Sequence, residues 1–178
     1  MQALIFLIRC VFYFGATLFL LRVFMQAFRV SGATQLGHFI LKTTAFLVIP
    51  TRKIIPNIAW FDTASFLIAL LFIAAYKAIE FALLGTVVVQ WAPFLGVFAL
   101  WVLFAFVRLI LDIFIFAILI FAVGSWLAPH HPIMPALAQF TRPLLAPVRR
   151  FIPPIAGVDL SPIIVLILLE ALIILLRF

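Results

Sequence analysis

Charged residues are scarce in this sequence. Only 10% of its residues are charged and 69% are hydrophobic, whereas soluble domains usually contain about 25% charged and about 45–50% apolar residues. This balance excludes an ordinary soluble domain. Apolar runs long enough to cross a bilayer recur four times. We therefore expect an all-α membrane protein that crosses the bilayer several times.

Residue sets that support catalysis or metal binding are also missing. Cys10 is the single cysteine and lies in an apolar run, which excludes an intramolecular disulfide and a cysteine-based metal site. His130 and His131 are adjacent, so their side chains point apart, and neither a carboxylate nor a cysteine is near; we interpret them as interfacial residues. The sequence contains no nucleophile–base–acid set, phosphate loop or acidic metal cluster. We predict a protein that is not an enzyme and has no cofactor.

Acidic residues are few, which leaves a net charge of +7. A nucleic-acid partner is one explanation, but basic cytoplasmic loops are the more usual one in a membrane protein, and we favour it. The N-terminal MQALIFLIRC lacks a basic segment and no small-residue cleavage site follows its apolar run. We interpret this run as a retained span rather than a signal peptide.

Four spans are expected, at about 3–27, 63–88, 94–127 and 161–178, arranged as two tandem helical hairpins. Each long loop, 28–60 and 128–158, has apolar residues at helical spacing and polar residues opposite, which predicts an amphipathic helix lying in the membrane interface. We expect Pro50 to end the first of these helices, and Pro143 and Pro147 to leave the second short or broken. Asp62 or Thr63 is the expected N-cap of the second span.

The start of the last span carries its own signal. Ser161 followed by Pro162 predicts an N-cap and then the first helical residue. In the second span Ala74, Ala78 and Ala82 recur every four residues; they are either filler or a stripe against which another helix packs.

The basic residues of the loops predict the orientation. Seven lie in the two long loops and none in the short connection between the second and third spans. By the positive-inside rule the long loops are cytoplasmic, and both termini and the short connection lie outside. The seven are Arg29, Lys42, Arg52, Lys53, Arg142, Arg149 and Arg150.

The chain repeats itself. Residues 44–62 and 141–159 align without a gap and share nine identities in nineteen columns, where about two are expected by chance in so biased a composition. We infer a tandem duplication, with one repeat at 1–92 and the other at 93–178.

The second copy contains the run P-x-R-R-x-I-P-P-x-x-G-x-D-L-S-P, which resembles the signature of the YggT (YGGT-repeat) family. Its motif positions are Pro147, Arg149, Arg150, Pro153, Pro154, Gly157, Asp159, Ser161 and Pro162. The first copy departs from the pattern at Asn57, Trp60, Ala64 and Ser65. The resemblance implies a small bacterial inner-membrane or thylakoid protein without an established catalytic activity. It also implies links to osmotic tolerance and cell division in bacteria, and to nucleoid distribution and haem attachment to a cytochrome b in plastids.

The loop cations are the first candidate site. They are Arg52, Lys53, Arg142, Arg149 and Arg150. These residues either bind anionic lipid headgroups or an acidic partner, or only fix the topology. A third possibility is an ion pair within each loop, from Arg52 or Lys53 to Asp62 and from Arg149 or Arg150 to Asp159, which would fold the loop back on the next helix start.

Charges inside the expected spans are the second candidate site. They are Arg9, Lys77, Glu80, Arg108, Asp112 and Glu170, and the predicted topology places all six between the midplane and the outer face. Arg108 and Asp112 are four residues apart, a direct pairing distance on one helix. An unpaired charge in a bilayer is costly, so we favour interhelical pairing over a pathway for an ion or proton.

We accordingly predict a membrane scaffold or assembly factor whose cytoplasmic loops contact a protein partner or anionic lipid. The alternative is a small-ion channel or transporter that contributes to osmotic tolerance. Four spans are few for a pore, so the alternative requires a homo-oligomer, which the alanine stripe of the second span favours.

Overall fold

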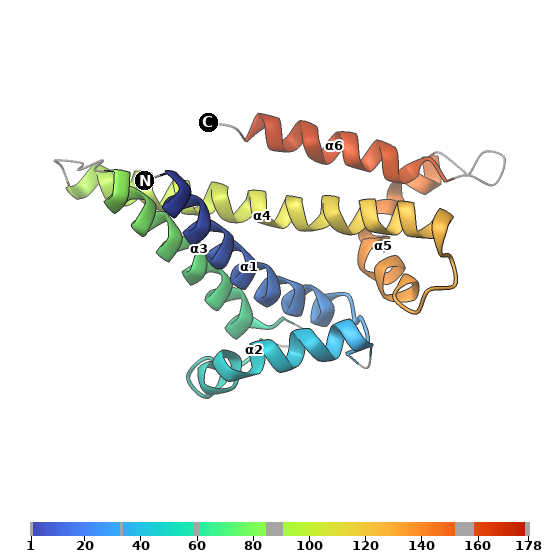
Figure 1. The fold of residues 1–178 in the computed structure, drawn as a ribbon, viewed down its shortest axis with the longest axis horizontal. Helices are drawn as coiled ribbons and strands as arrows, with labels where there is room; N and C mark the ends of the chain where they lie inside the picture. The colour runs from blue at the N-terminus through green and yellow to red at the C-terminus, as the bar shows by residue number, and fades with distance from the viewer. Residues whose placement is uncertain (1, 33, 59–60, 85–90, 152–158, 177–178) are drawn as a thin grey trace.

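The computed structural model describes residues 2–32, 34–58, 61–84, 91–151 and 159–176. These residues form six α-helices and no named strand (Figure 1). The helices are α1 (Gln2–Ala27), α2 (Gln35–Ile54), α3 (Thr63–Leu84), α4 (Trp91–Leu127), α5 (Met134–Phe151) and α6 (Ser161–Leu175). The all-α prediction is therefore confirmed for the described part of the chain.

Three helices are long and apolar enough to cross a membrane, namely α1, α3 and the Leu95–Leu127 part of α4. By length and composition the chain is thus a membrane protein. The fourth expected span is α6, which has 15 residues and a length of about 22 Å at 1.5 Å per residue. A bilayer core is about 30 Å thick, so α6 by itself is shorter than the other spans.

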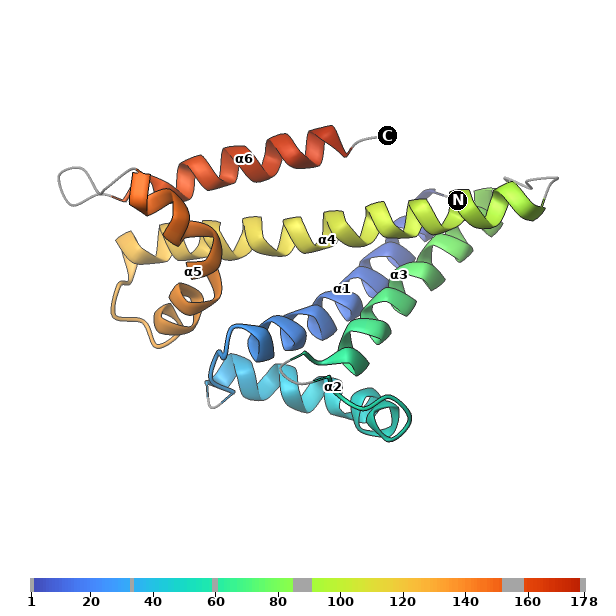
Figure 2. The ribbon, with the colours of Figure 1, turned by 180° about the vertical axis from the view of Figure 1, so that it is seen from behind.

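The helices are grouped in two pairs. α1 lies along α3, and α6 lies along α4, while α2 and α5 sit at the end of the molecule away from the N-terminus (Figures 1 and 2). The buried core joins the pairs through residues such as Phe19 on α1, Ile73 on α3 and Phe106 on α4. α6 packs against α4 and α5.

Both loop helices exist, but their prolines do not end them. Pro50 lies inside α2, where it cannot donate to the carbonyl four residues before it. The Thr51 hydroxyl donates to the Leu47 carbonyl at 2.7 Å, and the Ile55 amide donates to the Thr51 carbonyl at 2.9 Å, so helical bonding resumes past the proline. The prediction that Pro50 ends the helix is wrong; the helix changes direction instead (Figure 1).

The second loop helix behaves in the same way. Pro143 and Pro147 lie inside α5, which runs over 18 residues. The expected short or broken helix is therefore incorrect, and the ribbon bends between its first turns and its last (Figure 2). A proline removes one backbone hydrogen bond, and the helix bends there without ending.

The starts of α3 and α6 differ in how they are capped. Asp62 accepts from the Ser65 amide at 3.3 Å, the geometry of an N-cap, as expected. At α6, however, Leu160 is the N-cap, and Ser161 and Pro162 are the first two helical residues. Ser161 as N-cap is therefore wrong by one position. The reason is Asp159, whose Oδ1 accepts from the Ser161 amide at 2.9 Å and so supplies the cap from one residue earlier.

The end of α1 ties the two halves together. Arg29 adopts a left-handed φ of 55°, and the Val30 amide donates to the Met25 carbonyl at 2.8 Å, which is the pattern of a Schellman motif. The Gln139 amide of α5 donates to the Phe28 and Arg29 carbonyls at 3.1 and 3.0 Å. The second loop helix thus satisfies carbonyls that the end of α1 leaves free.

Candidate functional site

The first loop is closed by a buried carboxylate. Asp62 has no exposed surface, and its Oδ2 accepts from Arg52 Nη2 at 2.7 Å and from Arg22 Nε at 3.3 Å. The same oxygen accepts from the Ser65 hydroxyl at 2.8 Å. Burial alone would raise the pKa of the Asp62 carboxyl, but hydrogen bonds from Ser65 and Arg52 outweigh it and hold the pKa below its ordinary value.

Arg22 joins three helices at this point. It lies on α1, and its Nη1 donates to the Thr44 hydroxyl at 2.8 Å and to the Leu41 carbonyl at 3.3 Å, both on α2. Through Asp62 it also reaches the start of α3. The sequence gives no local signal for this role of Arg22, because its carboxylate partner is 40 residues away.

The second loop has the corresponding ion pair in a more open setting. Arg149 donates to Asp159 Oδ2 at 2.6 Å from Nη2 and 2.8 Å from Nε, and the Asp159 side chain is 29% exposed. The Arg149 guanidinium also lies 6.0 Å from the centre of the Phe121 ring on α4. Burial would raise the pKa of the Asp159 carboxyl, but hydrogen bonds from Ser161 and Arg149 keep it below its ordinary value.

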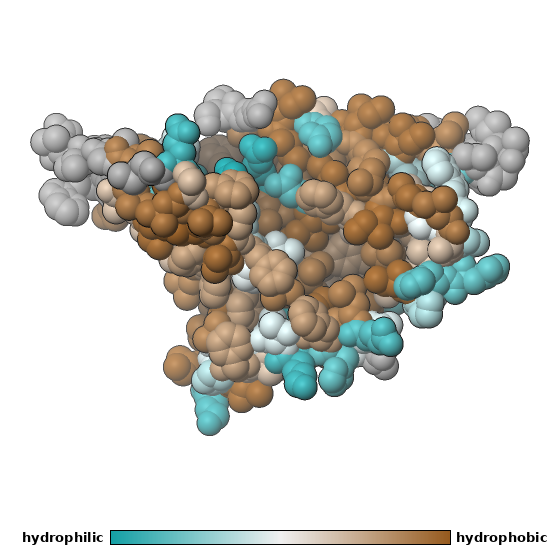
Figure 3. Space-filling view, viewed as in Figure 1, coloured by the Kyte–Doolittle hydropathy of each residue, from teal (hydrophilic) through white to brown (hydrophobic). Residues whose placement is uncertain are grey.

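Each loop thus contains an ion pair, one of the three possibilities that the sequence left open, and this divides the loop cations into two groups. Arg52 and Arg149 hold the loops in place. Lys53, Arg142 and Arg150 are exposed, and none has an ion pair among the residues that the structure describes. Hydrophilic side chains gather over α2 and α5 along the lower and right edges of Figure 3. Of the motif positions, Pro147 is exposed on α5, while Pro153, Pro154 and Gly157 lie outside the described residues.

A second site is a polar cavity of about 650 Å³ between α1, α3 and α4. Five of the six charges predicted inside the spans line it. They are Arg9, Lys77, Glu80, Arg108 and Asp112. Glu170 is not among the lining residues and is exposed on α6. The sequence predicted that these charges share one depth in the membrane, and the packing of three helices brings five of them to one cavity.

Two ion pairs form along the cavity wall. Lys77 Nζ lies 2.6 Å from Glu80 Oε2, and the Tyr76 hydroxyl donates to Glu80 Oε1 at 2.6 Å. Arg108 Nε and Asp112 Oδ2 are 4.0 Å apart, the expected pair in a long contact, and their side chains are 48% and 36% exposed. Each pair lies within a single helix, so these contacts do not provide the interhelical pairing that we favoured from the sequence.

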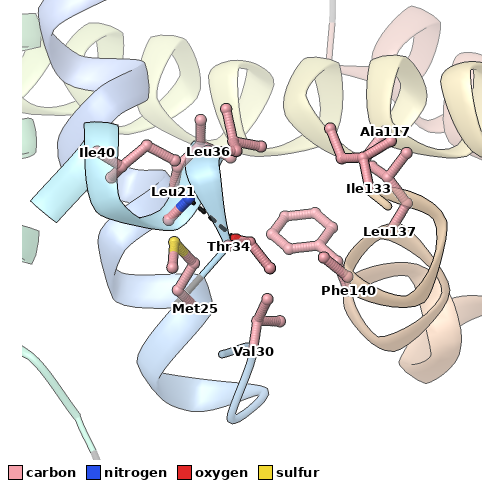
Figure 4. A pocket seen from close by; sticks show the side chains of 12 residues that line it. Leu21, Met25, Val30, Thr34, Leu36, Ile40, Ala117, Ile133, Leu137 and Phe140 are labelled. Atoms are coloured by element: carbon pink, nitrogen blue, oxygen red, sulfur yellow. Dashed lines mark hydrogen bonds between the residues drawn. The ribbon is translucent and has the colours of Figure 1, made fainter. Parts of the chain in front are cut away.

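A smaller cavity of about 70 Å³ lies where α1, α2, α4 and α5 meet (Figure 4). Side chains such as Leu21, Ile40 and Phe140 line it. The Thr34 hydroxyl faces this space but accepts from the Gly37 amide at 3.1 Å as the cap of α2. The space is apolar and small, and we interpret it as a packing gap between the two loop helices.

His130 and His131 are exposed in the turn between α4 and α5. His131 Nδ1 accepts from the Ile133 amide at 3.3 Å, which shapes the turn before α5. In the described ranges no group of three or more histidine, cysteine, aspartate or glutamate side chains could hold a metal ion.

Comparison with known proteins identifies the family. The model of the family described as CCB3/YggT matches the chain twice, over residues 1–79 and 100–178. The uncharacterized protein YggT of Escherichia coli strain K12 is 31% identical over 172 residues, which are 95% of this chain and 86% of that protein. An uncharacterized protein of Pseudomonas aeruginosa is 33% identical over 153 residues, 85% of this chain and 76% of that protein.

A third relative, the uncharacterized protein in the proC 3′ region of Vibrio alginolyticus, is 30% identical over 174 residues, 96% of this chain and 91% of that protein. No solved structure matches the chain. The two matches of the family model together span nearly the whole sequence, in agreement with the resemblance carried by the second loop. The chain belongs to the CCB3/YggT family.

Proposed function

We propose that this protein is a non-catalytic scaffold of the bacterial inner membrane, whose two cytoplasmic loop helices present a surface to a protein partner or to anionic lipid. The observation that carries the proposal is the pair of Arg–Asp contacts, Arg52–Asp62 and Arg149–Asp159. Each fixes a loop helix against the start of the next helix. A surface held in place before binding loses less conformational entropy when a partner docks.

The chemistry of this surface supports the same proposal. Lys42 and Lys53 on α2 and Arg142 and Arg150 on α5 are exposed cations. Large apolar side chains such as Phe46 are exposed beside them. Cations next to apolar side chains fit the interface of an anionic membrane, where each basic residue contributes about 1 kcal/mol.

The proposed topology has four spans, with α6 as the fourth and both termini outside the cytoplasm. Single cysteines at Gln90 and His130, each in a Cys10→Ser background, test it with a membrane-impermeant thiol reagent on intact cells. Labelling of Gln90→Cys and protection of His130→Cys are expected. The reverse pattern would invert the orientation, and labelling of both would mean that α4 does not cross the membrane.

The scaffold itself is tested by a photo-crosslinking residue at Phe46 or at Phe151, both exposed on the loop helices. A discrete cross-linked protein or anionic lipid is expected in cells, and it should disappear in an Arg142→Glu/Arg150→Glu variant. His38→Glu is the matched control, because it adds a negative charge on α2 without removing a cation. Cross-linking that is unchanged by the charge reversal would contradict the role of these cations.

A second candidate, a small-ion channel or transporter acting as a homo-oligomer, is favoured by the polar cavity and its five charges. Flux of a monovalent cation into proteoliposomes tests it, with Glu80→Gln inside the cavity and Glu170→Gln outside it as the control. Flux that is lost in Glu80→Gln and kept in Glu170→Gln would support the transport function. Absence of flux in the unmodified protein would exclude it and leave the scaffold.

A further inference from the structure

The polar cavity contains two arginines, one from each repeat. The matches of the family model cover residues 1–79 and 100–178. Arg9 lies on α1 in the first match and Arg108 on α4 in the second, and both line the same cavity of about 650 Å³. Each repeat therefore supplies one guanidinium group to one space.

The charges in the cavity do not balance. Three cations face two carboxylates, and Glu80 is occupied by Lys77 and by the Tyr76 hydroxyl. Arg108 reaches Asp112 only at 4.0 Å. Arg9 makes a cation–π contact with Phe6 at 5.5 Å, and it has no ion pair with any carboxylate among the described residues. An excess of positive charge is left on the two arginines.

The cavity lies near one end of the spans. Arg9 is seven residues from Gln2 at the start of α1, and Lys77 is seven residues from Leu84 at the end of α3, which places both about 10 Å from the helix ends. Charges at this depth are costly when they face hydrocarbon. A cavity of this size has room for about 20 water molecules at about 30 Å³ each, which is also room for a small polar group.

We propose that this cavity binds an anionic phosphate group, held by the guanidinium groups of Arg9 and Arg108. The planar fork of a guanidinium donates two parallel hydrogen bonds to phosphate oxygens, which an ammonium group cannot do. The phosphate belongs either to the headgroup of an anionic phospholipid or to a free phosphate ion. This site is distinct from the loop surface of the proposed scaffold and does not depend on it.

Cys10 provides a reporter at the site. It is the single cysteine, it is exposed, and it lines the cavity beside Arg9. A phosphate group in the cavity should slow the alkylation of Cys10 by a small maleimide. The experiment measures this rate on the full-length protein in detergent while phosphatidylglycerol, phosphatidylcholine of the same acyl chains, or inorganic phosphate is added.

Phosphatidylglycerol or inorganic phosphate is expected to slow the alkylation at least fivefold in the unmodified protein. Phosphatidylcholine should have a smaller effect, because its choline group cancels the negative charge. The concentration for half-protection should rise at least tenfold in Arg9→Gln and in Arg108→Gln, and partly recover in Arg9→Lys. Arg29→Gln is the matched control, since it removes an exposed cation just after α1 and outside the cavity, and it should leave protection unchanged.

The outcomes separate the two sources of phosphate. Protection by phosphatidylglycerol and not by inorganic phosphate assigns a lipid headgroup; protection by inorganic phosphate alone assigns a free ion. The thermal unfolding midpoint of each variant identifies any that fails to fold. If Arg9→Gln fails to fold, Arg9→Lys, which keeps the positive charge, takes its place in the test. The proposal is overturned if neither probe protects Cys10, if phosphatidylcholine protects as well as phosphatidylglycerol, or if protection survives in a folded Arg9→Gln/Arg108→Gln variant.

Discussion

The two loop junctions use one motif with two different results. In each, an arginine at the end of the loop helix pairs with an aspartate ten residues later, just before the next helix. In the first repeat Asp62 is fully buried, whereas in the second Asp159 is 29% exposed. The difference comes from the preceding long helix, which offers Arg22 to Asp62 and only the Phe121 ring to Arg149.

This contrast shows that a repeated motif can take different roles within one chain. Arg22 makes the first junction a lock, by which we mean a contact that holds α1, α2 and the start of α3 together, because the same side chain also donates to two groups of α2. The second junction joins α5 to α6, and its contact with α4 is the Phe121 ring beside Arg149. We therefore expect the first repeat to contribute more to stability, and the second to present the more accessible surface.

Loss of the buried carboxylate should have the largest effect. Asp62→Ala leaves Arg22 and Arg52 beside each other without a counter-ion, and breaking a buried ion pair costs about 3–5 kcal/mol. We expect a strong fall in the aggregation temperature in detergent and in cellular accumulation. A variant in which Arg22 and Arg52 are both replaced by glutamine should be no more stable than Asp62→Ala, since the buried Asp62 then lacks its counter-ions and keeps only the Ser65 donors. An Asp62→Ala protein as stable as the unmodified one would contradict the lock.

Removal of Arg22 should have an intermediate effect. In Arg22→Leu, Asp62 keeps Arg52 and Ser65 but α2 loses two hydrogen bonds from a charged donor, each worth about 1.5–3 kcal/mol at most. We expect a loss of about 2 kcal/mol in the free energy of unfolding. Thermal aggregation in detergent measures it, with Arg22→Lys as a conservative control that restores part of the loss. An effect as small as that of Asp159→Ala would show that Arg22 does not distinguish the repeats.

The equivalent change in the second repeat should cost less. Asp159→Ala removes a partly exposed pair, typically worth about 1 kcal/mol or less, and the cap on the Ser161 amide, worth about 1 kcal/mol. The expected result is a modest loss of stability together with faster amide exchange in the last turn of α5, measured by mass spectrometry. Exchange that changes equally in α2 would argue against a local effect.

The sequence predicted the contacts between residues that are close along the chain and missed those between residues that are far apart. The fixed spacing of the two adjacent cations in each loop from Asp62 or Asp159 made an ion pair in each loop one of the possibilities. The structure shows that Arg52 and Arg149 form these pairs. Long apolar runs likewise predicted α1, α3 and α4. Arg22 was missed because its partner is in another helix, and only packing shows that they meet.

Local sequence signals also failed to predict helix ends where neighbouring residues override them. Pro50 is a strong helix terminator in a sequence, yet bonding resumes at Thr51 and the helix bends. Ser161 is a good N-cap residue, but Asp159 binds its amide first. The polar cavity needs α1, α3 and α4 to be placed in space, so the sequence predicted the charges without predicting the cavity.

The smallest expected difference between the repeats is their response to mild acid. The pKa values of Asp62 and Asp159 are both held below the ordinary value, which is about 3.9 for an aspartate. The carboxylates therefore contribute stability that is fully present at pH 7 and is lost as the pH falls through the lowered pKa of the folded state. Between pH 7 and pH 4 the unfolding midpoint in detergent should change little on their account.

Below about pH 4, the ordinary range of these carboxyls, the unmodified protein should lose stability. The loss should be smaller in Asp62→Asn than in Asp159→Asn, because Asp62→Asn lacks the buried carboxyl group, to which we assign most of the acid response. A midpoint measured from pH 5 to pH 2.5 tests this order. If Asp62→Asn and Asp159→Asn keep the same acid response, the two junctions share the linkage equally, and burial with Arg22 does not set the first repeat apart.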